Sequence, residues 1–187
     1  MRKYLRFSVG ALVIMTVMIH AIYSQPAVAA DLAKIDRDVD SALQKLYNRI
    51  PSAKMLAAKA KGILVFPSII KAGLIVGGQY GEGALQKKGK TAGYYNTAAA
   101  SYGLQAGAQS FGYALFFMTD SALSYLDKSG GWEIGVGPSI VVVDEGTATT
   151  MTTTTAKDEI YALIFDQKGL MGGLGLQGTK ITKMEKR

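Results

Sequence analysis

The chain has 187 residues, 19% of them charged, and a formal net charge of +7 at neutral pH. This length suits a single domain, and the mildly basic balance favours an anionic partner surface without being a strong nucleic-acid signal. The chain has no cysteine and a single histidine, His20, which lies in the apolar N-terminal segment. Disulfide bonds, cysteine nucleophiles, histidine triads and structural zinc in its usual ligands are therefore excluded from the rest of the chain.

The first 30 residues are typical of a secretory signal peptide. Basic side chains at 2, 3 and 6 precede an apolar run from 7 to 22, and small residues then permit cleavage after Ala29 or Ala30. The alternative, a retained membrane anchor, is less favoured because the run is short for a span of about 20 residues. We therefore expect export and a single mature domain at 31–187, located in the periplasm or outside the cell and peripherally associated with a membrane.

Two helices are expected after the cleavage site. Apolar side chains recur every three or four positions from Asp31 to Ile50, which predicts an amphipathic helix that Pro51 ends. A short second helix is expected over 53–61, with Ser52 as its N-cap and Gly62 closing it. The lysines of this short helix either solvate a surface or present cations to a ligand.

Beyond Gly62 the sequence changes to short apolar runs separated by glycine and charged turns. The many glycines suit a strongly curved antiparallel sheet, in which a missing side chain permits bulges and close backbone approach. A short helix is expected at Ser121–Leu126. The threonine-rich segment 147–155 is expected to form a hairpin arm, with a secreted stalk as the alternative. The expected strands lie at 63–66, 74–76, 103–108, 114–118, 134–136, 140–143 and 160–165.

These elements predict an α+β fold. N-terminal amphipathic helices should pack on a curved, glycine-rich antiparallel β-sheet, which is either open or partly closed as a barrel.

Two short motifs lack the accompanying residues that their functions require. Residues 173–178 read Gly-x-Gly-x-x-Gly, but too few residues follow for the helix and the acidic residue of a dinucleotide site. A terminal strand that contains several glycines is expected there instead. Residues 108–112 resemble a nucleophile elbow, whose serine needs a histidine base that the mature chain lacks. No cofactor and no metal site is expected.

Ser68 and Lys71 form a Ser-x-x-Lys motif, the signature of hydrolases that pair a serine nucleophile with a lysine base. That chemistry needs the serine at the start of a helix and the lysine one turn later. The Ser-Asp-Asn partner motif is absent, and residues 90–93 only approximate Lys-Thr-Gly. A non-enzymatic function is therefore expected, and a Ser–Lys hydrolase is the third-ranked alternative.

Several glycine-rich segments resemble the lipid-binding SYLF domain. Residues 61–68 read KGILVFPS, and they are followed by KAG at 71–73, VGG at 76–78 and YGEG at 80–83. Residues 102–109 are similar to the family's Gly-x-Gln-x-Gly-x-Gln segment, and residues 168–174 are similar to its Lys-Gly-Leu-x-x-Gly segment. The combined pattern spans about residues 33–184 and resembles an exported bacterial member of the family.

The resemblance implies a non-enzymatic module that binds anionic phospholipid head groups at the bacterial envelope. Eukaryotic relatives are associated with phosphoinositides, membrane remodelling and actin, and their N-terminal amphipathic helix is implicated in membrane contact. Here the corresponding helix departs from a basic membrane helix, because it carries four aspartates: Asp31, Asp36, Asp38 and Asp40. The alternative function is a structural or protein-interaction module of the periplasm without lipid affinity.

The basic residues that match the family pattern are the candidate lipid-binding residues. They are Lys54, Lys59, Lys61 and Lys71. The hairpin that follows Lys61 is expected to return Lys71 beside the other three. A second lysine group, at 87, 88 and 90, lies in an expected turn and should contribute less to lipid binding. The expected partner is an anionic phospholipid membrane surface rather than nucleic acid; no protein partner is predicted.

Overall fold

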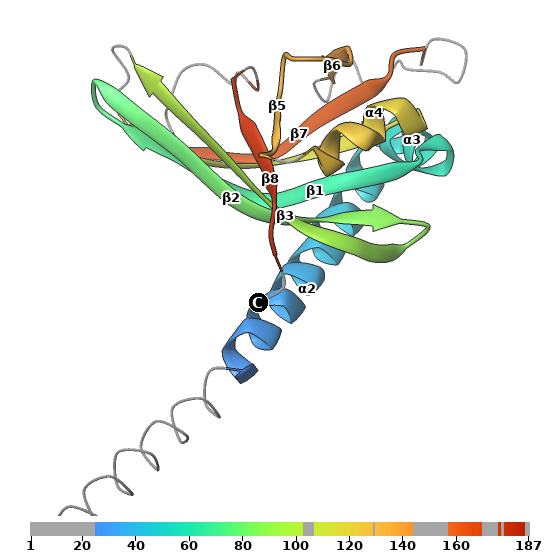
Figure 1. Cartoon of the computed structure of the whole chain (residues 1–187), viewed down its shortest axis with the longest axis horizontal. Coiled ribbons are helices and arrows are strands. Elements are labelled where there is room, and N and C mark those ends of the chain that lie inside the picture. Colours follow the sequence, from blue (N-terminus) through green and yellow to red (C-terminus); the bar gives the residue numbers. More distant parts are fainter. Residues whose placement is uncertain are drawn as a thin grey trace, which may run out of the picture. The chain divides into compact units, whose positions relative to one another are not determined.

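The chain folds as an α+β structure in which helices pack on a curved eight-stranded sheet (Figure 1). The computed structural model describes residues 25–102, 107–128, 130–143, 157–169, 176 and 178–185. Four segments with sequence predictions lie wholly or mostly outside these residues: the leader up to 24, the strand at 103–108, the threonine-rich 147–155 and the terminal strand at 173–178. The predicted α+β class and the predicted curved sheet are confirmed.

Three α-helices lie within the described residues: α2 (Gln25–Arg49), α3 (Pro51–Lys59) and α4 (Asp120–Ser124), the last continued by the 3-10 turn η1 (Tyr125–Asp127). Helix α2 begins before Asp31, because the segment ahead of it is rich in alanine, the strongest helix former. The short helix predicted at 121–126 is confirmed. Its N-cap is Thr119, whose hydroxyl accepts a 3.1 Å hydrogen bond from the Ala122 N–H.

The predicted caps of α3 are wrong. Pro51 is the first residue of α3, a position where its missing N–H costs nothing, so Ile50 is the N-cap residue and no side chain caps the helix. Gly62 does not close α3 but begins the first strand, because the helix already ends with Ala60 donating its N–H to the Leu56 carbonyl at 2.9 Å.

The chain divides into two compact units within α2. The first unit ends at Lys34 and contains the described start of that helix. The second unit, Ile35–Lys186, contains the rest of α2, the other helices and the sheet.

The sheet has the strand order β5-β8-β3-β2-β1-β4-β7-β6, with β1 and β2 at its centre. Six of its seven ladders are antiparallel, as predicted, and the ladder between β6 and β7 is parallel. A parallel pair requires a long connection, and β6 ends at Val143 whereas β7 begins only at Ile160. The strands are β1 (Gly62–Gly73), β2 (Val76–Lys87), β3 (Lys90–Tyr102), β4 (Gly107–Phe117), β5 (Trp132–Glu133), β6 (Ile140–Val143), β7 (Ile160–Gly169) and β8 (Lys180–Lys183).

Strand β1 runs on through Pro67, where a strand ending at Phe66 was predicted. Its register with both neighbours shifts between Val65 and Ile69, which marks a β-bulge. A bulge accommodates a proline, because the missing N–H is not needed by the ladder there. The partner strand must approach closely at this point, and Gly83 permits it: a Cβ on Gly83 would overlap the Val65 carbonyl oxygen.

The face of the sheet that carries α4, here called the inner face, is packed with large apolar side chains. Its centre is a row of aromatic rings, with Phe66 and Tyr113 at 5.0 Å and Phe117 and Trp132 at 5.9 Å between ring centroids. Leu123 and Leu126 of the α4–η1 segment pack on the same cluster. Burial of this apolar area is the main stabilising contribution on this side of the sheet.

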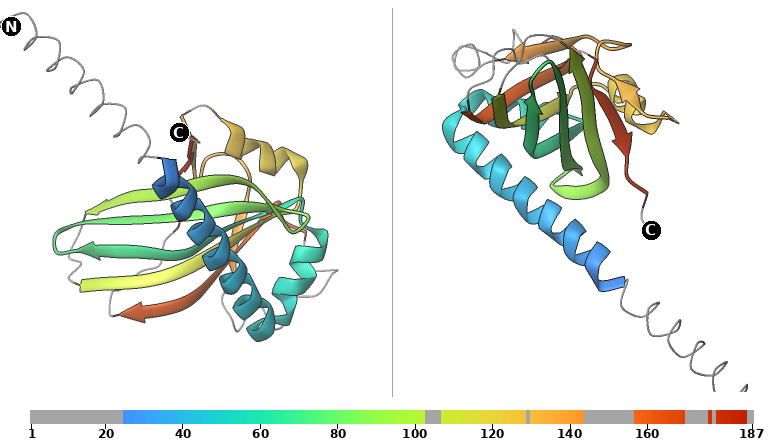
Figure 2. Two further views of the ribbon diagram at one scale, coloured as in Figure 1. Left: turned by 90° about the horizontal axis from the view of Figure 1, so that it is seen from below. Right: turned by 90° about the vertical axis from the view of Figure 1, so that its left-hand side faces the viewer.

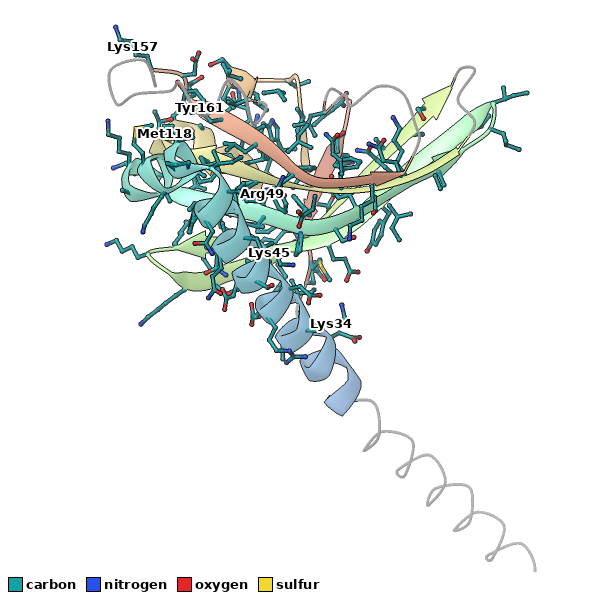
Figure 3. The ribbon with its side chains drawn as sticks, turned by 180° about the vertical axis from the view of Figure 1, so that it is seen from behind. Lys34, Lys45, Arg49, Met118, Lys157 and Tyr161 are labelled. Atoms are coloured by element: carbon teal, nitrogen blue, oxygen red, sulfur yellow. The ribbon has the colours of Figure 1, made fainter. Side chains whose placement is uncertain are left out.

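The opposite face, here called the outer face, packs against α3 and the part of α2 beyond Ile35 (Figure 2). The apolar stripe of the helices is buried, including Val39, Leu46 and Leu56. Polar contacts hold α2 near its middle and at its C-terminal end. The Asp36 carboxylate accepts hydrogen bonds from the hydroxyls of Thr91 and Tyr94 on β3, at 2.7 and 2.8 Å. Arg49 pairs with Asp166 of β7 at 3.0 Å (Figure 3).

Candidate functional site

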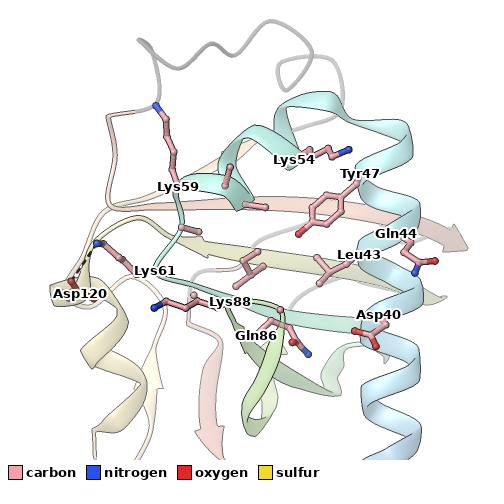
Figure 4. Close-up of a pocket in the computed structure, with 16 residues that line it drawn as sticks. Asp40, Leu43, Gln44, Tyr47, Lys54, Lys59, Lys61, Gln86, Lys88 and Asp120 are labelled. Atoms are coloured by element: carbon pink, nitrogen blue, oxygen red, sulfur yellow. Dashed lines mark ion pairs between the residues drawn. The ribbon is translucent and has the colours of Figure 1, made fainter.

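A basic groove opens where α2 and α3 meet one end of the sheet (Figure 4). Its volume is about 930 Å³. The segments that line it are the middle of α2, the end of α3, the start of β1, the β2–β3 turn and the start of α4. The lining residues are Asp40, Leu43, Gln44, Tyr47, Lys54, Ala57, Ala58, Lys59, Ala60, Lys61, Gly62, Ile63, Gln86, Lys88, Gly89 and Asp120.

Positive charge is in excess around this groove. Four lysines line it, from α3, the link to β1 and the β2–β3 turn, against two aspartates. Lys61 Nζ lies 3.9 Å from Asp120 Oδ2, and both side chains are at least half exposed. A pair this long and this exposed contributes little to stability, so Lys61 can exchange Asp120 for another anion at small cost.

The wall of the groove beside α2 is partly apolar. Leu43 and Ile63 are buried beneath it, and Tyr47 is half-buried with its ring directed into the space between the helices and the sheet (Figure 4). Burial raises the pKa of the Tyr47 phenol above its usual value, so its hydroxyl is a neutral hydrogen-bond donor at physiological pH. The groove can thus offer both cations and an uncharged donor to an anionic group.

The structure brings Lys54, Lys59 and Lys61 together at this groove, but not Lys71. Strand β1 carries Lys71 away from Lys61 to the other end of the sheet, a distance of roughly 30 Å at about 3.3 Å per strand residue. The expectation that the hairpin returns Lys71 beside the other three is therefore wrong. Lys71 lies on the inner face, only 8% exposed, in a buried polar row between Gln79 on β2 and Gln109 on β4.

Ser68 and Lys71 do not form a catalytic pair. Both lie on a strand rather than on the first turn of a helix. Ser68 is exposed on the outer face, whereas Lys71 is buried on the inner face, so the sheet separates the hydroxyl from the amine. Lys71 therefore cannot accept the Ser68 proton as the Ser-x-x-Lys chemistry requires.

Lys88 is the groove residue that the sequence analysis missed, because it was assigned to an unimportant turn. The turn assignment itself is correct: Lys88 and Gly89 both have positive φ, 51° and 73°, as a tight hairpin turn demands. The antiparallel ladder pairs Ile63 with Gln86 and so places this turn beside the start of β1. The Lys-Gly turn signal, combined with the length of β1, could have located Lys88 near Lys61.

Neither a metal site nor a membrane-spanning helix is found among the described residues. No group of three or more acidic or histidine side chains in the described part of the chain is arranged to hold a metal ion. None of the helices within the described ranges combines the length and the hydropathy that a membrane-spanning segment needs.

Comparison with known proteins yields one family. The family model Ysc84, whose description is Las17-binding protein actin regulator, matches residues 98–187. Ysc84 is the family model of the SYLF domain, so the predicted SYLF resemblance is confirmed over this stretch. No curated protein matches the chain at a significant level. The SYLF match covers the end of β3 and all elements from β4 to β8, whereas the groove residues precede it with the exception of Asp120.

Proposed function

We propose that this protein binds the head groups of anionic phospholipids at the basic groove, without catalysing a reaction. The observation that carries the proposal is that Lys54, Lys59, Lys61 and Lys88, from three separate segments, all line one groove. The SYLF match supports lipid binding as the general function. The proposed setting is the bacterial envelope, with an exported protein held peripherally at a membrane surface.

The charges of the groove fit a phosphate group better than a neutral ligand. Lysine is a compact point charge on a long stem, which suits a mobile head group more than a fixed, bidentate anion. The apolar stems and Leu43 provide a surface for the glycerol region beneath the phosphate. A basic residue close to an anionic membrane contributes about 1 kcal/mol before screening, so four together are sufficient for peripheral binding.

Vesicle co-sedimentation of the 31–187 chain tests this proposal. Vesicles of phosphatidylcholine with phosphatidylglycerol should sediment the protein, and vesicles of phosphatidylcholine alone should not. Replacing all four groove lysines by glutamine should weaken binding on the order of 10- to 100-fold at low salt, and less at physiological salt. A matched variant removes the same charge from four exposed lysines outside the groove: Lys45, Lys128, Lys157 and Lys183. Equal losses from both variants would indicate general charge attraction and contradict a groove site.

Two further substitutions sharpen the assignment. Asp120→Asn removes a negative charge and releases Lys61, so it should strengthen vesicle binding. Lys71→Gln tests the residue that the sequence grouped with the groove. Because Lys71 is buried at the far end of β1, its replacement should leave groove binding unchanged. A loss as large as that of the four-lysine variant would place the head-group site at that end instead.

A further inference from the structure

The β1–β2 hairpin ends in an apolar turn at the end of the sheet opposite the basic groove. Two-residue hairpin turns normally carry Asn, Asp or Gly, but here the two turn residues are Leu74 and Ile75. Leu74, Ile75 and the following Val76 are 72%, 59% and 67% exposed. Gly73 and Gly77 allow the two strands to approach closely beneath the turn, because a Cβ on Gly73 would overlap the Gly77 backbone.

The outer face beside this turn is also uncovered. Helices α2 and α3 of the second unit lie over the other end of the sheet, so these strand ends extend past them (Figure 2, left view). Ile70 and Tyr80 are cross-strand partners here, 64% and 51% exposed. Small residues fill the positions between this pair and the turn: Ala72, Gly78, Ala100 and Ala108. We call Ile70, Leu74, Ile75, Val76 and Tyr80 the tip surface.

Cations flank the tip surface on both sides. The sheet register places one row of residues across six strands, in the order Lys168, Ser110, Ile70, Tyr80, Ala98 and Lys180. The two terminal lysines are exposed. No acidic residue occurs between 70 and 81, and the next one, Glu82, accepts a 2.7 Å hydrogen bond from the Tyr80 hydroxyl. An apolar centre with a tyrosine and lateral lysines matches the layered chemistry of an anionic bilayer, with hydrocarbon below and phosphates above.

We infer that the tip surface inserts into the apolar layer of an anionic membrane, with Lys168 and Lys180 against its phosphates. This inference rests on the proposed lipid-binding function and adds a second, apolar contact. A bilayer fits better than a second copy of the chain. Face-to-face packing of two copies would bring the two lysine-bordered surfaces together, and the repulsion between like charges opposes such a dimer.

Fluorescent labelling at single cysteines tests insertion directly, since the chain has no native cysteine. Ile75→Cys would be labelled with an environment-sensitive nitrobenzoxadiazole probe, and Val142→Cys, an exposed valine on β6, is the matched control. On vesicles of phosphatidylcholine with phosphatidylglycerol, the probe at 75 should shift to shorter wavelength and be quenched by spin labels on the lipid chains. The probe at 142 should stay in water. Co-sedimentation with an unshifted probe at 75 would overturn the inference and leave the proposed function standing.

A substitution series supplies the second readout. Replacing Leu74, Ile75 and Val76 by serine removes apolar area that the free protein leaves exposed, so the fold should survive, as far-UV circular dichroism can verify. Vesicle affinity should fall on the order of 10- to 100-fold, and the loss should persist at high salt because the contact is apolar. Val136→Ser combined with Val142→Ser is the matched control and should bind normally.

The remaining outcomes separate the two proposals. Loss of vesicle binding in the groove-lysine variant, together with an unchanged tip variant, would support the groove alone and refute insertion. The reverse would refute the groove and support insertion. A probe at 75 that becomes buried without vesicles, with a molar mass that doubles by light scattering, would show that a second copy covers the tip and would overturn the inference.

Discussion

At the scale of single residues, several polar side chains buried on the inner face are hydrogen-bonded to one another. The hydroxyls of Thr97 and Tyr113 lie 2.9 Å apart, and both residues are fully buried. Gln79 donates from Nε2 to Thr179 Oγ1 at 3.1 Å. Burial raises the pKa of Tyr113 well above the ordinary value and that of Tyr95 to about 12, because the ionised phenolate would lose its hydration.

The raised pKa of Tyr113 predicts a stability change at alkaline pH. An unfolded tyrosine ionises near pH 10, whereas buried Tyr113 stays protonated, so the stabilisation is complete below pH 10. It is lost as the pH rises from 10 towards the folded pKa, at up to about 1.4 kcal/mol per pH unit. Tyr113→Phe should cost about 1–3 kcal/mol at pH 7, because Thr97 loses its partner. Urea unfolding at pH 8 to 11 should show this difference shrinking above pH 10, and a constant difference would contradict the pKa assignment.

At the scale of elements, α2 is held by polar contacts near its middle and at its C-terminal end, and by an apolar stripe between them. Asp36 joins it to β3, and Arg49 joins it to β7. The two contacts differ in how much they contribute to stability. The Arg49–Asp166 pair is substantially exposed and contributes little, whereas the Asp36 carboxylate accepts two short hydrogen bonds in a partly buried position.

Asp36→Ala should therefore destabilise the protein by about 2 kcal/mol, since it leaves the hydroxyls of Thr91 and Tyr94 without this partner. Asp40→Ala, one turn further along the same helix at an exposed residue that lines the groove, is the control and should change the stability by less than about 0.5 kcal/mol. Chemical denaturation of the two variants under the same conditions provides the measurement. Equal losses of stability would mean that the charge on the helix, and not the link to β3, accounts for the effect.

At the scale of the whole second unit, the sheet separates two apolar layers and contributes side chains to both. Residues of one strand alternate between the layers, so Leu64 packs on the inner side and Val65 on the outer side of β1. Neither layer can lose its packing without disturbing the common strands. The two layers are therefore expected to unfold together.

Leu46→Ala tests this coupling. Leu46 is buried in the outer layer, and its truncation should cost about 2–5 kcal/mol. Trp132, the single tryptophan of the chain, is buried in the inner layer and reports on it by fluorescence. The urea midpoints from tryptophan fluorescence and from far-UV circular dichroism should shift by the same amount. A shift in the circular dichroism midpoint alone would mean that the layers unfold separately.

The sequence predicted the elements that have strong periodicity and missed those that lack it. The α2 stripe and the apolar run of β7 predicted their elements directly, whereas the run at 114–118 predicted only the last part of β4. Most of β2 and β3 was missed, because these strands are built from glycine, alanine and tyrosine and contain no apolar run. The candidate site was found in part: Lys54, Lys59 and Lys61 are neighbours in the chain, whereas Lys88 joins them only through the β1–β2 register. Lys71 was misplaced because a long strand was taken for a short hairpin.

The bulge at Pro67 has a consequence for how this protein can change. It inserts one extra residue into β1, so the alternation of side chains reverses there: Phe66 points inward, yet Ser68 and Ile70 point outward. Because Pro67 is the extra residue, deleting it would straighten β1 and leave the far half of the strand as it is, with Lys71 facing inward and Ile70 facing outward. A deletion of one residue at this point can therefore be absorbed by the loss of the bulge, without exchanging the side chains that this end of the molecule presents to water.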